Sequence, residues 1–515
     1  MTSSDTTDEP TSAPETPRSE ISPARRWIIL ATVVSATTLY AMNILIVSVV
    51  LPQMQGSLSA TPDQIAWVLT FNILATAVVT PMTGWLTGRF GWRNVMLWGM
   101  IGFTIATVFC GLAGSLEALV LWRILQGGFG APIVPLAQAV ILDTFPRRQH
   151  AVVTSIFGMG VVVGPIVGPI YGGYLAELYN WRWAFFMLVP IGVVSIAAIW
   201  AFLHEGGRQR GVRLDWTGFL ALSVALVALQ LVLDRGERLD WFESVEIILE
   251  AGLGLAAFWV YLTHSVTADK PFLDLKLLRD RNYALGLIIV TVYGMLNFTP
   301  MVMLPPMLKD LGGYPESIIG TLLGFRGIGA VIGFFSSMWV GRMDPRIGIT
   351  VGLLLQAWSG VYMMGFNMET TFLDVAFTST LQGLSVGLIW VPLTTATFAT
   401  LDKRFLPETS AVYHLLRNVG SSIFISLSVF TLVHTGQMNY ARLTEFITPY
   451  NELLKYPGYS AGFDIDTVTG LARISAELVN QANMIGFINA FGLYTLACVI
   501  VLPLIPFVRP PRRGN

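Results

Sequence analysis

The stretch from Ala151 to Ala176, AVVTSIFGMGVVVGPIVGPIYGGYLA, decides the fold class of this chain. It is apolar and longer than the roughly 20 residues that a helix needs to cross a bilayer, yet it holds six glycines and two prolines. Each glycine in a helix interior costs about 1 kcal/mol relative to alanine, so their number requires a reason. Small residues four apart let two helices pack closely, and glycine and proline let a membrane helix bend. The stretch therefore predicts either a tightly packed membrane helix or the hinge of a transporter.

The composition of the whole chain agrees with a membrane protein. Of 515 residues, 54% are hydrophobic and 12% are charged, and the mean hydropathy is +0.63, whereas soluble proteins carry about 25% charged residues. The net charge of −1 gives no indication of nucleic-acid binding. Cys110 and Cys498 lie in apolar segments, and no cluster has metal-ligand spacing, so we expect no disulfide framework, metal or cofactor. The absence of a nucleophile pattern such as Ser-x-x-Lys disfavours a membrane-embedded enzyme.

Fourteen apolar segments follow one another along the chain. They cover residues 27–51, 65–86, 94–114, 117–142, 151–176, 182–203, 216–233, 245–264, 284–305, 317–340, 348–367, 372–397, 411–434 and 485–507. Basic residues concentrate in the N-terminal tail and in alternate loops, so the positive-inside rule assigns those loops and both termini to the cytoplasm. The sequence predicts an all-α polytopic membrane protein with 14 transmembrane helices.

The first six segments and the last six repeat each other. Ile124-Leu125-Gln126-Gly127 is matched by Thr380-Leu381-Gln382-Gly383, and the next segments open alike with Ala151-Val152 and Ala411-Val412. Two related bundles with a substrate site between them near the bilayer midplane are a transporter architecture. The predicted divisions are a disordered cytoplasmic tail (1–26), an N-terminal six-helix bundle (27–203), an inserted helix pair with a cytoplasmic linker (204–283), a C-terminal six-helix bundle (284–507) and a cytoplasmic tail (508–515).

The predicted C-terminal bundle contains a long outer loop, residues 435–484. The second half of this loop has apolar residues at helical spacing, so we expect it to extend the last helix outward. A loose external loop and a docking surface for a periplasmic partner both fit the sequence.

Four motifs together resemble those of the fourteen-helix branch of the major facilitator superfamily, and within it the EmrB/QacA type of multidrug exporter. They are Gly160-x-x-x-Gly164-Pro165-x-x-Gly168, Gly84-Trp85-Leu86-x-x-Arg89-x-Gly91, Arg123-Ile124-Leu125-Gln126-Gly127 and Leu416-Arg417-Asn418-x-Gly420. The resemblance extends from Trp27 to Phe507. It implies the major facilitator fold, two six-helix bundles plus two inserted helices, and drug:proton antiport by alternating access in the inner membrane. It also implies a periplasmic adaptor and an outer-membrane channel as partners in a Gram-negative cell.

Two positions depart from the family pattern. Asn43 stands where relatives often carry an Asp in the first helix, and Gly88 replaces the Asp of the loop signature. An amide cannot carry a proton, so coupling must use another group, be carried by substrate charge, or be lost. One alternative to a proton-coupled exporter is therefore an uncoupled facilitator. A second alternative, which concerns direction and cargo, is an importer or exporter of a specific metabolite.

Arg123 is the charge that lies deepest in the first six segments, where an arginine usually faces a cavity or a partner. Both donation to helix-end carbonyls and a role in coupling fit it, and Gln126 shares its face at i+3. Arg326 and Arg417 fit either snorkelling or a functional role. Among the acids at segment ends, Glu117, Glu246, Glu250 and Asp374, we expect Asp374 to carry the proton, because it lies near the outer mouth of the second half. The residues expected in coupling and gating are Arg89, Arg123, Gln126, Gly164, Pro165, Gly168, Asp374 and Arg417.

A hydrophobic or amphipathic substrate requires an apolar, aromatic lining with few polar groups. The residues expected to face it are Met42, Asn43, Trp67, Asn72, Gln138, Tyr293, Asn297 and Trp390. Taken singly, an aromatic or methionine side chain at such a position also fits packing between helices or exposure to lipid.

Overall fold

The computed structural model describes residues 22–206, 213–269, 271–340, 344–448, 450–451, 463 and 467–509. Over these ranges the secondary structure is helical, without a strand, and thirteen helical segments are long and apolar enough to cross a membrane. The helix α14 (Pro345–Met363) is not among the thirteen, but it packs within the bundle against α15 and α18. With α14 included, the arrangement agrees with the expected fourteen helices.

The first half of the chain supplies six membrane-crossing units. They are α1 (Pro23–Ser57), α2 (Pro62–Val79) continued by η1 (Thr80–Met82) and α3 (Thr83–Phe90), α4 (Trp92–Leu112), α5 (Leu116–Gly130) with α6 (Ile133–Thr144), α7 (His150–Leu178), and α8 (Trp183–Phe186) with α9 (Leu188–Phe202). The next two helices are α10 (Trp216–Arg235) and α11 (Val245–Thr267). The second half contains α12 (Arg281–Pro306) with η6 (Met307–Leu311), α13 (Glu316–Val340), α14, α15 (Phe372–Phe398), α16 (Leu406–Thr444), and α18 (Val468–Val501) with η9 (Leu502–Phe507).

Local sequence explains where several helices begin and end. The Thr61 side chain accepts from the Gln64 backbone while the Gln64 side chain accepts from Thr61, and Pro62 follows the cap, so α2 begins with a complete capping box. Gly91 ends α3 and precedes α4 with a φ of 85°, a conformation that favours glycine. The break between α3 and α4 in the loop signature thus has a backbone cause.

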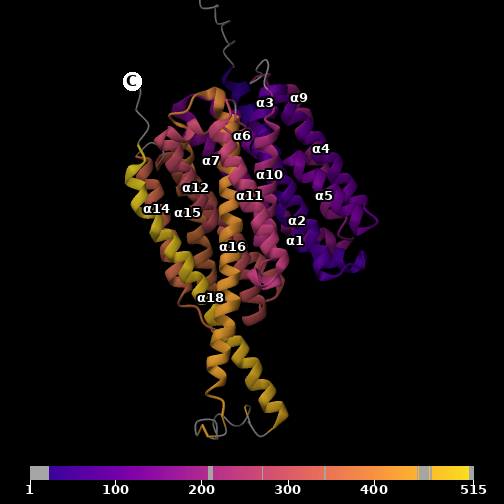
Figure 1. Cartoon of the computed structure of the whole chain (residues 1–515), viewed down its shortest axis with the longest axis vertical. Helices are drawn as coiled ribbons and strands as arrows, with labels where there is room; N and C mark the ends of the chain where they lie inside the picture. Colours follow the sequence, from indigo (N-terminus) through magenta and orange to yellow (C-terminus); the bar gives the residue numbers. More distant parts are fainter. Residues whose placement is uncertain are drawn as a thin grey trace, which may run out of the picture.

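The internal repeat appears in the way the helices pack. In the first half, α1 packs against α7 and α9, α5 against α2 and α4, and α4 against α9. In the second half, α12 packs against α16 and α18, α15 against α13 and α14, and α14 against α18. These are the same five pairings, taken in chain order. The pair α10 and α11 pack together, and α10 contacts both α2 and α16, so this pair touches both halves (Figure 1).

The two sides of the helix bundle differ. The described chain begins with α1 and ends with η9 on one side, which we call the terminal side (Figure 1). On the opposite, stalk side, α16 and α18 run past the other helices as a two-helix projection (Figure 1). The expected extension of the last helix beyond the bundle is confirmed, because α18 already begins at Val468; that this side faces outward stays a prediction. Parts of the predicted outer loop, residues 449, 452–462 and 464–466, and most of the two predicted tails lie outside the described residues.

The glycines of α7 face α1 at very short range. A Cβ on Gly164 would lie 2.6 Å from the Thr38 carbonyl oxygen, and one on Gly168 would lie 2.8 Å from the Met42 carbonyl oxygen. The Thr38 hydroxyl also donates to the Gly160 carbonyl across 3.0 Å. The glycines spaced four apart therefore let two helix backbones touch, as expected for tight packing. Bending at Gly164-Pro165 during transport stays a prediction.

Candidate functional site

A buried polar network surrounds Arg123 in the first half. The Arg123 side chain is 1% exposed, and its guanidinium donates to the Val68 carbonyl (3.1 Å), to Asn43 Oδ1 (3.2 Å) and to Gln126 Oε1 (2.6 Å). Gln126 Nε2 in turn donates to Thr107 Oγ1 across 2.7 Å. We call Asn43, Thr107, Arg123 and Gln126 the first arginine cluster. It ties α1, α4 and α5 together. Gln126 lies on the same face of α5 as Arg123, as expected, and the two side chains also share a hydrogen bond.

A second network of the same kind surrounds Arg326. This side chain is 7% exposed, and its guanidinium donates to Gln382 Oε1 and to Asn297 Oδ1, both across 2.9 Å. Gln382 Nε2 donates to Ser359 Oγ across 3.0 Å. We call Asn297, Arg326, Ser359 and Gln382 the second arginine cluster. Snorkelling of Arg326 to the membrane surface, one of the two sequence-based interpretations, is wrong, because the guanidinium is buried among neutral oxygens in the middle of the bundle.

The two clusters occupy equivalent places in the internal repeat, except that the arginine comes from a different helix in each half. Each takes an asparagine from the first helix of its half, a hydroxyl from the third and a glutamine from the fourth. The arginine comes from α5 in the first half but from α13 in the second. Close approach of Gly127 to the Asn72 carbonyl and of Gly383 to the Arg326 carbonyl shows that Asn72 and Arg326 are the equivalent positions. The repeat motif in the sequence therefore identified Gln382 but could not identify its arginine.

The charge of each cluster is fixed and positive. Arginine does not lose its proton in proteins, and the oxygens that Arg123 and Arg326 contact belong to amides and backbone carbonyls. Among the buried residues that the structure describes, none is an Asp or a Glu. Each buried charge is thus stabilised by hydrogen bonds to neutral acceptors, and its own proton is not available for exchange.

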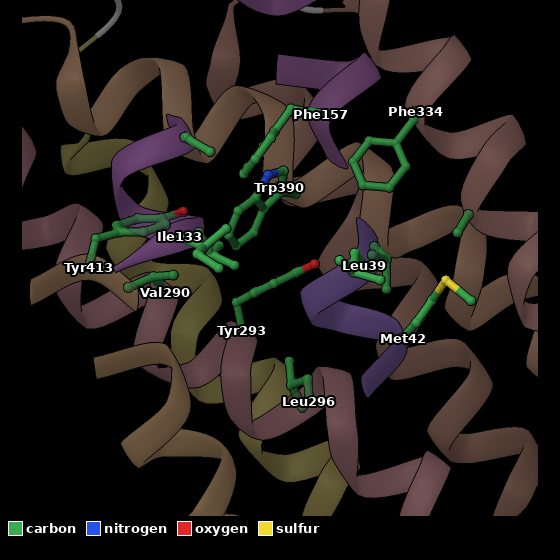
Figure 2. Packing of buried hydrophobic residues seen from close by; sticks show 14 of the residues in the cluster. Leu39, Met42, Ile133, Phe157, Val290, Tyr293, Leu296, Phe334, Trp390 and Tyr413 are labelled. Carbon is green, nitrogen blue, oxygen red and sulfur yellow. The ribbon is translucent and has the colours of Figure 1, made fainter. Parts of the chain in front are cut away.

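Aromatic side chains fill the contact between the two halves. Trp390 of α15 lies with its ring centroid 5.4 Å from that of Tyr293, 5.6 Å from that of Tyr413 and 5.8 Å from that of His414. The Arg417 guanidinium stacks over the Trp390 ring at 5.4 Å. Figure 2 shows Ile133, Phe157 and Leu39, which belong to α6, α7 and α1 of the first half, gathered around Trp390 and Tyr293. We call Tyr293, Trp390 and Tyr413 the aromatic seal.

Two polar contacts also join the halves on the terminal side. His414 Nε2 of α16 donates to Gln138 Oε1 of α6 across 2.5 Å, and both side chains are buried. Nearer the membrane surface, Lys403 Nζ donates to the Asp143 carbonyl (3.0 Å) and pairs with its carboxylate (3.5 Å). His414 was not singled out from the sequence, because a lone histidine near the start of an apolar segment carries no local motif.

Contacts between the halves gather toward the terminal side. A Cβ on Gly84 would lie 2.8 Å from the Glu408 Cβ, and the Phe334 ring lies directly against Gly158. The halves also meet at the middle of α7, where Gly327 of α13 lies directly against the Ile166 side chain. Beyond this contact, Tyr171 and Tyr174 of α7 are more than half exposed. The structure thus shows a transporter-like arrangement that is closed on the terminal side.

The other residues singled out from the sequence occupy varied positions. Asp374 is not brought near either arginine cluster: its carboxylate accepts from Thr371 N (3.0 Å), Thr371 Oγ1 (2.6 Å) and Tyr362 Oη (2.7 Å) in the capping box of α15. Arg89 lies exposed at the end of α3. Asn72 donates to the Arg123 carbonyl (2.8 Å), so it joins α2 to α5.

Two of the residues expected to line the substrate site occupy positions that packing between helices or between rings accounts for. The Met42 side chain is buried, and the Met42 backbone lies against Gly168 of α7. Trp67 is nearly half exposed and packs edge-to-face on Phe71, with ring centroids 6.5 Å apart. Asn43 and Asn297 belong to the two arginine clusters, Tyr293 and Trp390 belong to the aromatic seal, and Gln138 contacts His414.

Comparison with known proteins gives one consistent result. A family model described as Major Facilitator Superfamily matches residues 33–425. Multidrug export protein EmrB of Haemophilus influenzae is 30% identical over 489 residues, which cover 92% of this chain and 94% of that protein. EmrB of Escherichia coli K12 is 30% identical over 490 residues, with the same coverage. Fatty acid resistance protein FarB of Neisseria gonorrhoeae is 28% identical over 494 residues, covering 95% of this chain and 97% of that protein.

Solved structures agree on the fold. The human organic anion transporter MFSD10 superposes with a TM-score of 0.63 at 12% identity, covering 94% of this chain and 100% of that chain. A double-tryptophan mutant of XylE superposes with a TM-score of 0.60 at 12% identity, covering 95% of this chain and 97% of that chain.

Proposed function

Because this chain belongs to the major facilitator superfamily, we propose that it exports hydrophobic or amphipathic compounds from the cell by alternating access, in exchange for protons. The observation that carries the proposal is the meeting of two similarly packed halves at one contact that is closed on the terminal side. A substrate site between two such halves is the expected arrangement in this class of transporter. The export proteins EmrB and FarB, similar over nearly the whole chain, support the direction and the class of cargo.

The terminal side is, on this proposal, the cytoplasmic side of the inner membrane. The basic residues of the N-terminal tail and of alternate loops support this orientation. The structure would then be outward-facing, ready to release substrate and accept a proton from outside. The moving bodies would be residues 27–203 and 284–507, with the inserted pair between 204 and 283 and the tails 1–26 and 508–515 outside them.

Within this scheme the arginine clusters hold fixed charges beside the transport path. Arg123 with Gln126 and Arg417 over Trp390 would sense the substrate, while Arg89 would act in the gate on the terminal side. Bending of α7 at Gly164, Pro165 and Gly168 would accompany the change of access. These roles rest on the positions of the residues and on the family motifs.

The fixed charge also constrains the substrate. Arg123, Arg326 and Arg417 place positive charge in the bundle, and no Asp or Glu occurs among its described buried residues. Coulomb attraction and repulsion are strong where water is excluded. Neutral and anionic amphiphiles are therefore favoured over cationic ones, and the fatty acid resistance named for FarB fits this preference.

The projection formed by α16 and α18 is proposed to contact a periplasmic adaptor, which would continue the path toward an outer-membrane channel. The projection supports this because its helices leave the bundle on the stalk side (Figure 1). Shortening both helices by matched turns should lower resistance of whole cells but spare transport into inside-out vesicles. Equal loss in both assays would instead assign the projection a role in folding.

Deleting the gene and measuring susceptibility to a panel of anionic, neutral and cationic amphiphiles tests the proposed function. We expect sensitivity and intracellular accumulation to rise for anionic and neutral compounds. Unchanged sensitivity and accumulation across the panel would favour an importer or exporter of a specific metabolite. Inside-out vesicles test coupling separately: uptake that ignores an imposed pH gradient would point to an uncoupled facilitator.

A further inference from the structure

Resting on the proton exchange proposed above, we infer that His414 binds the exchanged proton, and that its hydrogen bond to Gln138 couples proton binding to closure of the terminal side. Neither the family motifs nor the relatives' names assign this residue. The inference stands on the charge inventory of the bundle, on the geometry of the pair and on the position of the pair between the two halves.

The charge inventory leaves few groups that can exchange a proton in the bundle. Asn43 is an amide, and the buried arginines keep their protons. Among the described residues, no carboxylic acid is fully buried. Glu408 of α16 is partly buried at the contact with Gly84, and its Oε1 already accepts from the Asp274 backbone N–H across 2.9 Å. Asp374 is partly exposed, and its carboxylate already accepts three hydrogen bonds in a helix cap. Histidine is the side chain whose ordinary charge change falls near neutral pH, and His414 is buried at the contact between the halves.

The geometry leaves one ring nitrogen ready for a proton. His414 is 2% exposed, and Nε2 donates to Gln138 Oε1, so Nδ1 carries the lone pair of the neutral ring. Nδ1 is buried and has no hydrogen-bond partner among the described residues, and the same holds for Gln138 Nε2. Buried polar atoms are nearly always paired. Two unpaired atoms in one contact between the halves therefore indicate a pair that changes its partners during function.

The surroundings make a second charge unfavourable while the terminal side is closed. Arg417 lies three residues along α16, over the same Trp390 ring that contacts His414. The phenols of Tyr413, on α16, and Tyr293, on α12, face the same ring. From α6 comes Asp143, whose carboxylate is already paired with Lys403. Within the described ranges no carboxylate contacts the imidazole, so a protonated ring there would be a buried cation beside another cation.

These observations define a cycle in which only the proton on Nδ1 is gained and lost. In the closed form, the neutral ring holds Gln138 and the aromatic seal is complete. A proton that arrives from the stalk side binds Nδ1, and the buried charge favours separation of α6 from α16, so that water reaches the ring. The proton leaves Nδ1 on the terminal side, substrate enters, and the neutral ring closes on Gln138 again. One proton moves inward as substrate moves outward.

Reconstituted full-length protein in liposomes tests the inference, with an anionic dye found to be a substrate of the wild type as probe. We expect His414→Gln to lose the stimulation of dye accumulation by an imposed pH gradient, from about tenfold or more in wild type to about onefold, while gradient-free counterflow of the dye stays measurable. His264→Gln is the matched control, because His264 pairs with Asp215, the N-cap of α10, and not with a residue of the seal. This variant should respond to the gradient as wild type does. A His414→Gln variant that accumulates dye with the wild-type gradient response would overturn the inference. A wild type that ignores the gradient would refute proton antiport itself, which separates the two failures.

A second measurement follows the closure directly and does not need transport. Cysteines replacing Asp143 and Lys403, whose side chains meet on the terminal side, report closure by disulfide cross-linking. With His414 present, the cross-linked fraction should fall as pH is lowered from 8 to 5, roughly in the range where histidine titrates. Loss of the thiolate slows disulfide formation at low pH in any protein, so the two backgrounds are compared. With His414→Gln added, only this thiol-dependent fall should remain, and it should be smaller than the fall with His414 present. The same pH dependence in both backgrounds would overturn the inference, even if His414→Gln transports poorly for other reasons.

Discussion

The close contact between α7 and α1 predicts how much stability the protein loses when Gly164 is replaced by Ala. Replacing Gly164 by Ala adds a Cβ 2.6 Å from the Thr38 carbonyl oxygen, 2.9 Å from the Ala41 Cβ and 2.9 Å from the Met42 backbone nitrogen. Two of these atoms belong to the helix backbone, so relief requires α1 itself to move. Overpacking of this kind costs about 1–3 kcal/mol, while alanine returns about 1 kcal/mol of helix propensity.

A second glycine-to-alanine variant, at a position without close neighbours, corrects for the gain in helix propensity. Gly324 lies in the helix α13, and a Cβ there would have nothing within 4 Å. Gly164→Ala should therefore be about 1–3 kcal/mol less stable than Gly324→Ala, since both gain the same propensity. Cys110 and Cys498 are fully buried, so a thiol-reactive dye reports thermal unfolding of the detergent-solubilised protein without added labels. Equal unfolding temperatures for the two variants would refute the close approach of α7 to α1.

Three further predictions concern the charged groups. Asn43→Asp should be tolerated, because the new carboxylate would lie near 3.2 Å from the Arg123 guanidinium and form an ion pair; loss of the protein from the membrane would contradict this. Arg326→Lys should lower transport by about tenfold or more, because an ammonium cannot reproduce the planar contacts to both Gln382 and Asn297. The control is Arg442→Lys on the projecting part of α16, which should transport at nearly the wild-type rate. Asp374→Asn should lower the free energy of unfolding by about 1 kcal/mol, because it weakens the capping box of α15. The response to a pH gradient should stay intact. If vesicles with this variant lose that response, Asp374 is the residue that binds the exchanged proton.

The helices could be predicted from the sequence because their causes are local. An apolar run of sufficient length must form a helix in a bilayer, where every backbone group needs an internal partner. The pair Arg123 and Gln126 was equally accessible, because residues three apart on a helix share a face. Even the structural use of Asp374 had a local signal, since Thr371-x-x-Asp374 before an apolar run is the pattern of a capping box. Its charge near a segment end nevertheless favoured a coupling role when the sequence was read alone.

The contact between Gln138 and His414 had no such signal. The two residues are 276 positions apart in the chain, and neither belongs to a motif that the halves share. Only the packing of α6 against α16 brings them together. The amide and the imidazole become informative once their burial and their unpaired nitrogen atoms are known.

The arginine clusters show why an internal repeat can conceal a shared site. Asparagine, hydroxyl and glutamine keep their helices in both halves, but the guanidinium reaches the glutamine from α5 in one half and from α13 in the other. A long arginine side chain can reach the same point from either of two packed helices, so what the halves share is the place of the charge. Each cluster then holds one buried positive charge among neutral oxygens, and neither charge can titrate. If the proton is exchanged within the bundle, the group that binds it must lie outside both clusters, and the contact between the halves is where its charge would affect access to the two sides of the membrane.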